Sequence, residues 1–398
     1  MTSLVFFVLA VTVKVGVIVG LLLLLVAWMP WVERKILGRI QLRRGPSHTG
    51  TFGLLQPIAD GIKILAKEDI TPRNAFKPIY LLAPAIVGAT AIFSFSVIPF
   101  GDWTIHLSDL HPELHEFPLG YITDLDMAVL FVLAMSSMAV YGVAWGGWAG
   151  GSKYGLLGGL RASAQMISYE LSVGLVLLGI VMLSGSLSLV EIVELQANRG
   201  WNLLYQPVGM VLFIVTMFAE TNRLPFDLPE AETELVGGYH TEYSSMRFGL
   251  FFLGEYLHMI TISALCTILF LGGWLPPFSN LAFWGMLRDL PVLGSLVPVF
   301  WFLLKTFFFL FLFIWVRGTF PRFRYDQLMK IGWKVLLEMA FVNLFLAALM
   351  RGYWPSTDAT GLIGPWFFIQ MGFFLVFLIL MFAWPTNQRP GKTVRLED

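Results

Sequence analysis

The sequence predicts an all-α integral membrane protein with about nine transmembrane helices and one amphipathic surface helix. Of the 398 residues, 57% are hydrophobic and only 13% are charged, whereas a soluble domain has about 25% charged residues. The mean hydropathy is +0.74. Apolar runs of about 20 residues, the length that crosses a bilayer, recur along the whole chain without a long hydrophilic block between them. We therefore expect residues 1–398 to form a single polytopic membrane domain.

The predicted spans follow one another from the first apolar run. This run is too long for the core of a signal peptide and has no small-residue cleavage site before Trp31, so we expect a retained helix. The nine expected spans are 4–29, 79–100, 126–146, 167–188, 202–219, 248–272, 296–316, 333–350 and 362–384.

Basic residues predict the orientation of these spans, because cytoplasmic loops retain Lys and Arg. Of the 26 basic residues, 21 lie in the segments on one side, and only Arg199, Arg288 and Arg351 lie in the loops on the other. We expect the N-terminus outside and the C-terminus in the cytoplasm. The equal number of acidic residues gives no argument for a nucleic-acid partner.

The first cytoplasmic loop, 30–78, contains an expected amphipathic helix. Within 53–67, apolar residues recur at nearly helical spacing and polar residues fill the other positions. This pattern is typical of a helix that lies on the membrane surface. A plain lipid anchor explains the same pattern.

An acidic hairpin, 220–247, is the most unusual loop. Pro225 and Pro229 exclude one continuous helix through 224–229. Carboxylates crowded at low dielectric repel one another, so some of them should hold protons near neutral pH. A solvated acidic loop is the alternative interpretation. The carboxylates are Glu220, Asp227, Glu230, Glu232, Glu234 and Glu242, with Arg223 among them.

Ionisable residues also fall within predicted spans, where they are functional candidates by default. These residues are Glu170, Glu255, Lys305 and Glu338. Structural pairing, such as a carboxylate with Lys305 or Arg247, is the alternative. A glycine cluster at 146–159 predicts a tight cytoplasmic turn.

Cofactor chemistry within the chain has little support. The single cysteine, Cys266, rules out an intrachain disulfide or a self-contained iron–sulfur site. The sequence His115–Leu119 begins like a zinc HExxH motif but lacks its second histidine. We find no phosphate-binding or dinucleotide glycine motif and expect no metal site and no cofactor bound by this chain alone.

Long blocks of the sequence resemble the H-type membrane subunit of respiratory complex I, the proton-pumping NADH:quinone oxidoreductase. They run from the first span to the start of the eighth, and the run 362–384 adds a ninth span that shorter members of the family lack. The matching blocks are VERKILGRIQLRRGP at 32–46, GLLQPIADGIK at 53–63, AMSSMAVYGVAWGGWAGGSKYGLLGGLRASAQMISYE at 134–170, AETNRLPFDLPEAETELVGGYHTEY at 219–243 and PRFRYDQLM at 321–329.

This resemblance implies a role at the junction of the electron-transfer arm and the membrane arm. The chain would form much of a tunnel for ubiquinone or menaquinone, and the FMN and iron–sulfur clusters would lie in partner subunits. The residues implied for the quinone tunnel are Arg34, Arg43, Asp60, Arg223, Phe248, Phe252 and Arg317. The residues implied for the start of the proton path are Glu170, Glu220, Asp227, Glu230, Glu232 and Glu255.

The implied partners are the other complex I subunits, quinone and membrane lipid, and the implied location is a bacterial inner membrane. An alternative is the membrane subunit of an energy-converting hydrogenase, which shares the fold but needs no quinone tunnel. A stand-alone proton-coupled transporter would be expected to show internal repeats, and none is evident. A purely structural anchor would leave the carboxylates within spans unexplained.

Overall fold

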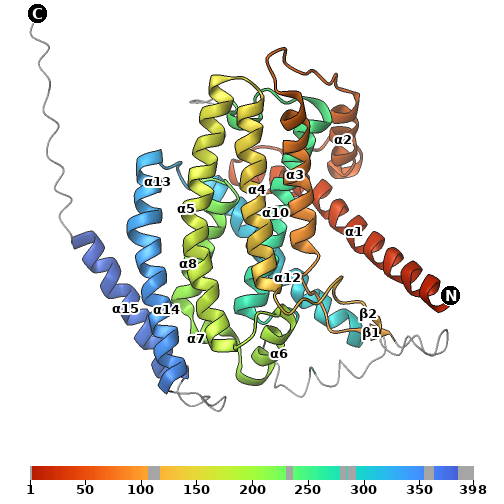
Figure 1. Ribbon diagram of the computed structural model, residues 1–398. Helices are drawn as coiled ribbons and strands as arrows, with labels where there is room; N and C mark the ends of the chain where they lie inside the picture. The colour runs from red at the N-terminus through yellow and green to blue at the C-terminus, as the bar shows by residue number, and fades with distance from the viewer. Residues whose placement is uncertain are drawn as a thin grey trace, which may run out of the picture.

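The computed structural model describes residues 2–105, 117–229, 236–277, 284, 293–353 and 363–383. Over these residues it is a helical bundle with one short antiparallel strand pair, β1 to β2 (Figure 1). The elements are α1 (Thr2–Ile40), η1 (Thr51–Gly53), α2 (Gln56–Ala66), α3 (Lys77–Phe95), β1 (Thr104–Ile105), β2 (Phe117–Pro118), α4 (Ala128–Ala149), α5 (Lys153–Ser184), α6 (Leu189–Arg199), α7 (Asn202–Tyr205), α8 (Pro207–Glu220), η2 (Gly238–His240), α10 (Ser245–Leu271), α12 (Leu293–Thr319), α13 (Tyr325–Ile331), η3 (Gly332–Leu336), α14 (Leu337–Tyr353) and α15 (Ile363–Ala383).

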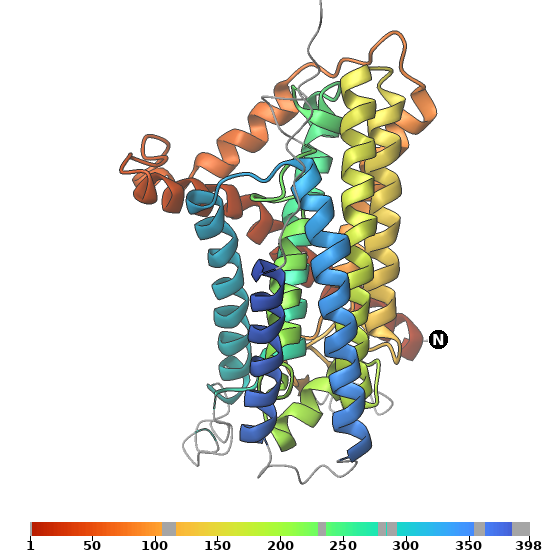
Figure 2. The same ribbon diagram turned by 90° about the vertical axis from the view of Figure 1, so that its left-hand side faces the viewer.

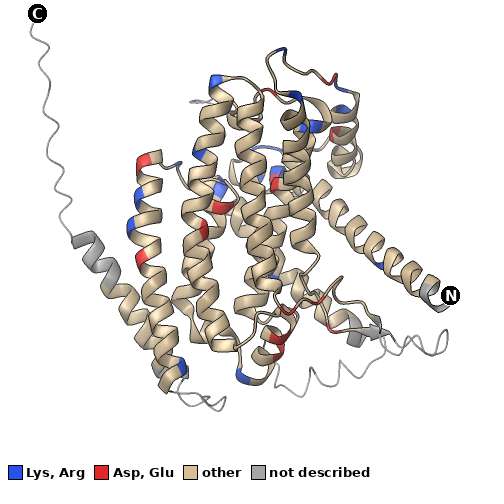
Figure 3. Cartoon of the chain, in the orientation of Figure 1, with Lys and Arg blue, Asp and Glu red and all other residues tan. Residues whose placement is uncertain are grey.

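The structure confirms the all-α membrane fold class. Seven of the described helices are long and apolar enough to cross a bilayer, and α8 and part of α15 are shorter apolar helices. Each of the nine predicted spans overlaps a helix, although 202–219 is divided between α7 and α8 and 79–100 extends past the end of α3. The charged residues of the helices lie mainly near their ends, apart from a group in the middle of the bundle (Figure 3).

Two predicted boundaries are wrong. The first helix continues through Pro30 to Ile40, so it carries part of the first loop's charge into the bundle. The glycine cluster forms a turn only at residues 150–152, and α5 starts at Lys153 instead of 167. The other glycines let α4 and α5 approach closely: a Cβ on Gly147 would lie 2.4 Å from the Gly155 carbonyl oxygen.

The helix α2 matches the expected surface helix, with none of its residues buried in the chain. Apolar side chains of Ile58, Ile62 and Leu65 are all exposed, as they would be on a helix that rests on lipid. It packs against α1 and α10 at the side of the bundle (Figure 2).

The centre of the bundle is α10, which packs against α3, α12, α6 and α8 and is mostly buried from Tyr256 to Phe270. It ends at Leu271, and the next residue, Gly272, has a φ of +70° that closes the helix. Lys305 of α12 donates to the carbonyls of Leu271, Gly273 and Leu275 at 2.6, 3.0 and 2.6 Å. A cation at a helix C-terminus complements the helix dipole. The partners of Lys305 seen here are thus backbone carbonyls and not the carboxylate that the sequence suggested.

The eighth span is not one regular helix. A π-helical turn, η3, joins α13 to α14, beside the ring of Tyr169, whose hydroxyl donates to the Leu328 carbonyl at 2.9 Å. Glu338, in the first turn of α14, is exposed. The helix α15 packs against α7 and α8.

Candidate functional site

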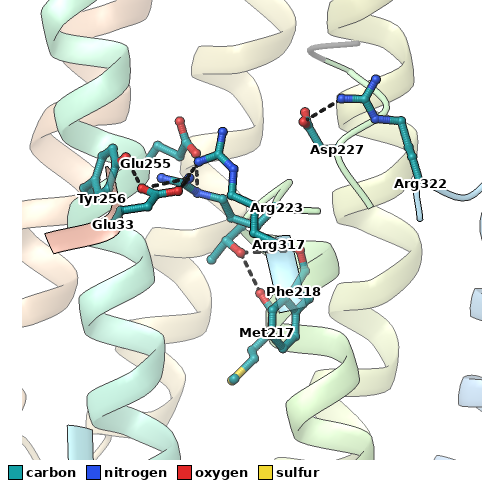
Figure 4. Close-up of polar contacts among 10 residues, drawn as sticks. Glu33, Met217, Phe218, Arg223, Asp227, Glu255, Tyr256, Arg317 and Arg322 are labelled. Carbon is teal, nitrogen blue, oxygen red and sulfur yellow. Dashed lines mark hydrogen bonds and ion pairs between the residues drawn. The ribbon is translucent and has the colours of Figure 1, made fainter. Parts of the chain in front are cut away.

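The charged group in the middle of the bundle is built around Glu33 of α1 (Figure 4). Glu33 is only 4% exposed. It accepts hydrogen bonds from Arg223 at 3.1 Å and from Arg317 and Tyr256. Buried charges need such pairing. The extension of α1 past Pro30 brings Glu33 here, and Arg317 comes from the last turn of α12.

Arg223 connects Glu33 to Glu255 of α10. It lies just beyond the end of α8, where Asn222 has a φ of +51° and the backbone N–H of Arg223 donates to the Phe218 carbonyl at 3.1 Å. Its Nε lies 2.6 Å from Glu255 Oε1. Burial alone would lower the pKa of Arg223, but the carboxylates of Glu255 and Glu33 hold it well above its usual value.

A cavity of about 110 Å³ opens beside these charges. Phe248 and Phe252, one turn apart on α10, line it with nearly parallel rings 6.2 Å apart. The full lining is Arg223, Tyr239, His240, Phe248, Phe251, Phe252, Glu255 and Arg317. The cavity thus combines cationic donors with flat aromatic faces.

A second, smaller cavity of about 40 Å³ shares Glu255, Tyr239 and Phe251 with the first. Glu220 and His258 line it too, and His258 Nε2 lies 3.5 Å from Glu220 Oε1. Glu255 is therefore the carboxylate that the two cavities share.

Two consecutive serines of α4 each hold one carboxylate. Ser136 donates to Glu220 at 2.5 Å, and Ser137 donates to Glu170 of α5. Glu220 is 4% exposed, and Glu170 is half-buried. Glu220 therefore shares the second cavity with Glu255, and the consecutive serines connect it to Glu170.

Asp227 lies apart from this series, in the loop after α8. It accepts a hydrogen bond from Arg322 at 3.0 Å (Figure 4). Burial raises the pKa of Asp227 above its ordinary value, and Arg322 offsets part of that rise.

The remaining residues implied by the resemblance lie elsewhere. Arg34 and Asp60 form an exposed ion pair of 2.9 Å between α1 and α2. The Nε of Arg43 donates to Gln41 at 2.7 Å on the exposed surface. Glu230 and Glu232 lie outside the described residues, as do the first two residues of the HExxH-like segment, His115 and Glu116. The structure thus brings Arg223, Arg317, Glu255 and the two phenylalanines together, and leaves Arg43 apart.

Sequence reasoning gave no individual role to Glu33, Tyr256, Ser136, Ser137 or His258. Glu33 stands directly before Arg34 and Lys35, which suggests a surface position. One signal was available for Glu33. Residues 30–40 contain no helix breaker other than Pro30, so the first helix could continue through them. The serines carry no charge and had no distinguishing pattern.

Among the described residues, no three His, Cys, Asp or Glu side chains gather as metal ligands could. The arrangement offers cationic hydrogen-bond donors beside an aromatic wall, and a series of hydroxyl-bound carboxylates leading away from them. Such groups can bind a flat, carbonyl-bearing molecule and can pass protons.

Comparison with known proteins gives consistent results. The model of the NADH dehydrogenase family matches residues 13–348. A protein of Koribacter versatilis, named as a second H-type subunit of NADH-quinone oxidoreductase, is 49% identical over 357 residues, covering 88% of this chain and 99% of its own. The H-type subunit of Thermomicrobium roseum is 50% identical over 344 residues, covering 84% and 94%. A second H-type subunit of Syntrophobacter fumaroxidans is 49% identical over 341 residues, covering 86% and 94%.

Proposed function

This chain belongs to the NADH dehydrogenase family, and from that membership we propose that it is the H-type membrane subunit of a proton-translocating NADH:quinone oxidoreductase. It forms much of the tunnel by which a quinone reaches the electron-transfer arm, and it starts the proton path into the membrane arm. It is not catalytic alone, because the electrons come from FMN and iron–sulfur clusters in partner subunits.

The quinone side of the proposal rests on the cavity beside Arg223. Guanidinium groups of Arg223 and Arg317 can donate to quinone carbonyl oxygens, and the rings of Phe248 and Phe252 offer faces for a planar headgroup. At about 110 Å³ the cavity is smaller than typical ligand pockets of about 300–1,000 Å³. The proposal therefore assigns the remaining walls to partner subunits, and assigns the tunnel entrance to Arg34, Asp60 and Arg43 with α2.

The observation that carries the proposal is that Glu255 lines both cavities. Reduction of a quinone to a quinol takes up two electrons and two protons. Charges interact more strongly at low dielectric, so a charge change near Arg223 acts on its ion pair with Glu255. A change in the charge or protonation of Glu255 then acts in turn on Glu220 and Glu170. The proposal also assigns Asp227, Glu230 and Glu232 to the start of the proton path, as the resemblance of the acidic hairpin implies.

The location follows from the same reasoning. We place the chain in a bacterial inner membrane with its N-terminus outside and its C-terminus in the cytoplasm, because the basic loops and the acidic hairpin then face the cytoplasm. The partner subunits of the peripheral arm dock on that face.

Glu255→Gln tests the proposal in the purified complex reconstituted into liposomes. We expect fewer protons translocated per quinone reduced, while part of the NADH-driven quinone reduction remains. Glu338→Gln is the matched control, because Glu338 is an exposed carboxylate on α14. Unchanged rate and stoichiometry in Glu255→Gln would refute the coupling role. Hydrogen evolution without quinone-dependent NADH oxidation would refute the quinone assignment itself.

A further inference from the structure

Two amide side chains are fully buried at the end of α8 opposite to Glu220. Gln206 precedes α8 and Asn343 lies on α14, and both are 0% exposed. Since α8 runs from 207 to 220, about 20 Å along its axis separates this place from the carboxylate series. The amides therefore belong to a different site.

Neither amide has a hydrogen-bond partner among the described residues. The oxygen and the nitrogen of both side chains are unpaired. Nearly all buried polar groups in proteins are paired with protein or with ordered water, and unpaired polar groups are especially unfavourable inside a bilayer. Four such amide atoms in one place therefore indicate a polar partner other than the described residues.

Two glycines lie directly against the two amides. A Cβ on Gly179 of α5 would lie 2.9 Å from the Gln206 amide nitrogen and 3.4 Å from that of Asn343. A Cβ on Gly209 of α8 would lie 3.1 Å from the Gln206 amide oxygen and 3.2 Å from the Asn343 nitrogen. The two amides thus lie side by side where α5, α8 and α14 meet.

The helix α15 covers this place. Gln370 of α15 donates to the Tyr205 carbonyl at 2.8 Å, one residue before Gln206, and its own amide oxygen is unpaired among the described residues. Trp366 packs in a cluster with Leu183, Tyr205, Leu346, Ala347 and Met350. The match to the family model ends at residue 348, so α15 is an addition to the matched part of the chain.

We propose that Gln206 and Asn343 form a buried water-binding site between α5, α8 and α14, which α15 closes from the lipid. A buried water makes about three hydrogen bonds to otherwise unpaired groups and needs a polar site of this kind. The water bridges the two amides and so fixes the first turn of α8 against α5 and α14. The inference does not depend on the proposed function.

Electron cryomicroscopy of the purified complex, at a resolution that shows ordered waters, tests the proposal. We expect density within hydrogen-bonding distance of both amides in the natural protein. A direct amide-to-amide hydrogen bond with no water density between them would overturn the proposal.

Glycine variants add a second test. In Gly179→Ala the new methyl group enters the site, so the water density should be lost, and Gly209→Ala should do the same from α8. Gly174→Ala is the matched control, because a Cβ at this position of α5 has nothing within 4 Å. Equal water density in Gly179→Ala, Gly209→Ala and Gly174→Ala would overturn the assignment to these amides.

Discussion

Arg223 and Glu33 are 190 residues apart in sequence, yet they form a buried ion pair at 3.1 Å in the middle of the bundle. Their side chains are 9% and 5% exposed. Arg317 and Tyr256 bind the same carboxylate. The end of α8 is therefore tied to α1, α10 and α12 through one side chain.

Glu33→Gln should destabilise the protein strongly. The change leaves Arg223 and Arg317 beside a neutral group, and removal of one partner from a buried pair costs about 3–5 kcal/mol. Thermal unfolding of the detergent-solubilised complex measures the effect. Asp60→Asn is the control, because its pair with Arg34 is exposed and such pairs contribute about 0–1 kcal/mol. Equal effects of the two variants would contradict a central role for Glu33.

Arg322→Gln should change the pH dependence of stability. The pKa of Asp227 is raised above the ordinary value of 3.8, so the folded state binds more protons than the unfolded state above that pH. Stability is thus lost as pH rises through the raised pKa. Removal of Arg322 raises the pKa of Asp227 further and moves this loss to higher pH.

Unfolding curves measured between about pH 4 and about pH 8 check this expectation. The lower limit is about the ordinary pKa of aspartate, and the upper limit lies above it. Asp227→Asn should remove the dependence, and exposed Arg324→Gln should leave it unchanged. A shift of the same size in Arg324→Gln would assign it to general surface charge.

Ser136→Ala should lower the free energy of unfolding more than Ser137→Ala does. Both serines donate to a carboxylate, but Glu220 is buried and Glu170 is half-buried. A hydrogen bond to a charged group contributes about 1.5–3 kcal/mol, and the loss is largest where water cannot replace the donor. Unfolding of the two variants side by side measures the difference, and each serves as the other's control. The reverse order would show that Glu170 is the less hydrated carboxylate.

Lys305→Met should loosen the end of α10. The ammonium group binds three carbonyls, so its loss should cost at least about 2 kcal/mol. Amide hydrogen exchange should rise locally at residues 267–275. Lys330→Met, an exposed lysine of α13, is the control. No local rise in exchange would mean that Gly272 and its neighbours end the helix without the cation.

Phe252→Ala should raise the quinone KM about tenfold, because a lost aromatic contact of about 1.4 kcal/mol corresponds to that factor. The NADH-driven quinone reduction rate as a function of quinone concentration gives the value. Phe345→Ala removes an exposed ring on α14 and should leave KM unchanged. An unchanged KM in Phe252→Ala would separate this cavity from quinone binding.

The helices could be predicted because a bilayer imposes long apolar runs, which survive as a pattern in one sequence. Helix ends were harder. A glycine cluster is typical both of a turn and of a close contact between helices, so composition alone cannot distinguish the two. Gly147 and Gly155 belong to a close helix contact.

The partners of ionisable residues were hardest to predict. Arg223 and Glu255 were recognised as candidates, yet Glu33 was not, because its adjacent basic residues suggested a solvated surface. For Lys305, a carboxylate partner was the alternative to a functional role, whereas three backbone carbonyls bind it. Such pairs join residues that only the packing of helices brings together.

The π-helical turn at Gly332–Leu336 determines the direction in which each side chain of α14 points around the helix axis. A turn of this kind holds one residue more than an α-helical turn, and one residue corresponds to about 100° of rotation about the helix axis. Deletion of a single residue from the turn would therefore swing Asn343 and Ala347 away from α5 together, although neither side chain had been altered. The length of this short segment is as much a determinant of the α14 interface as the identity of the residues within it.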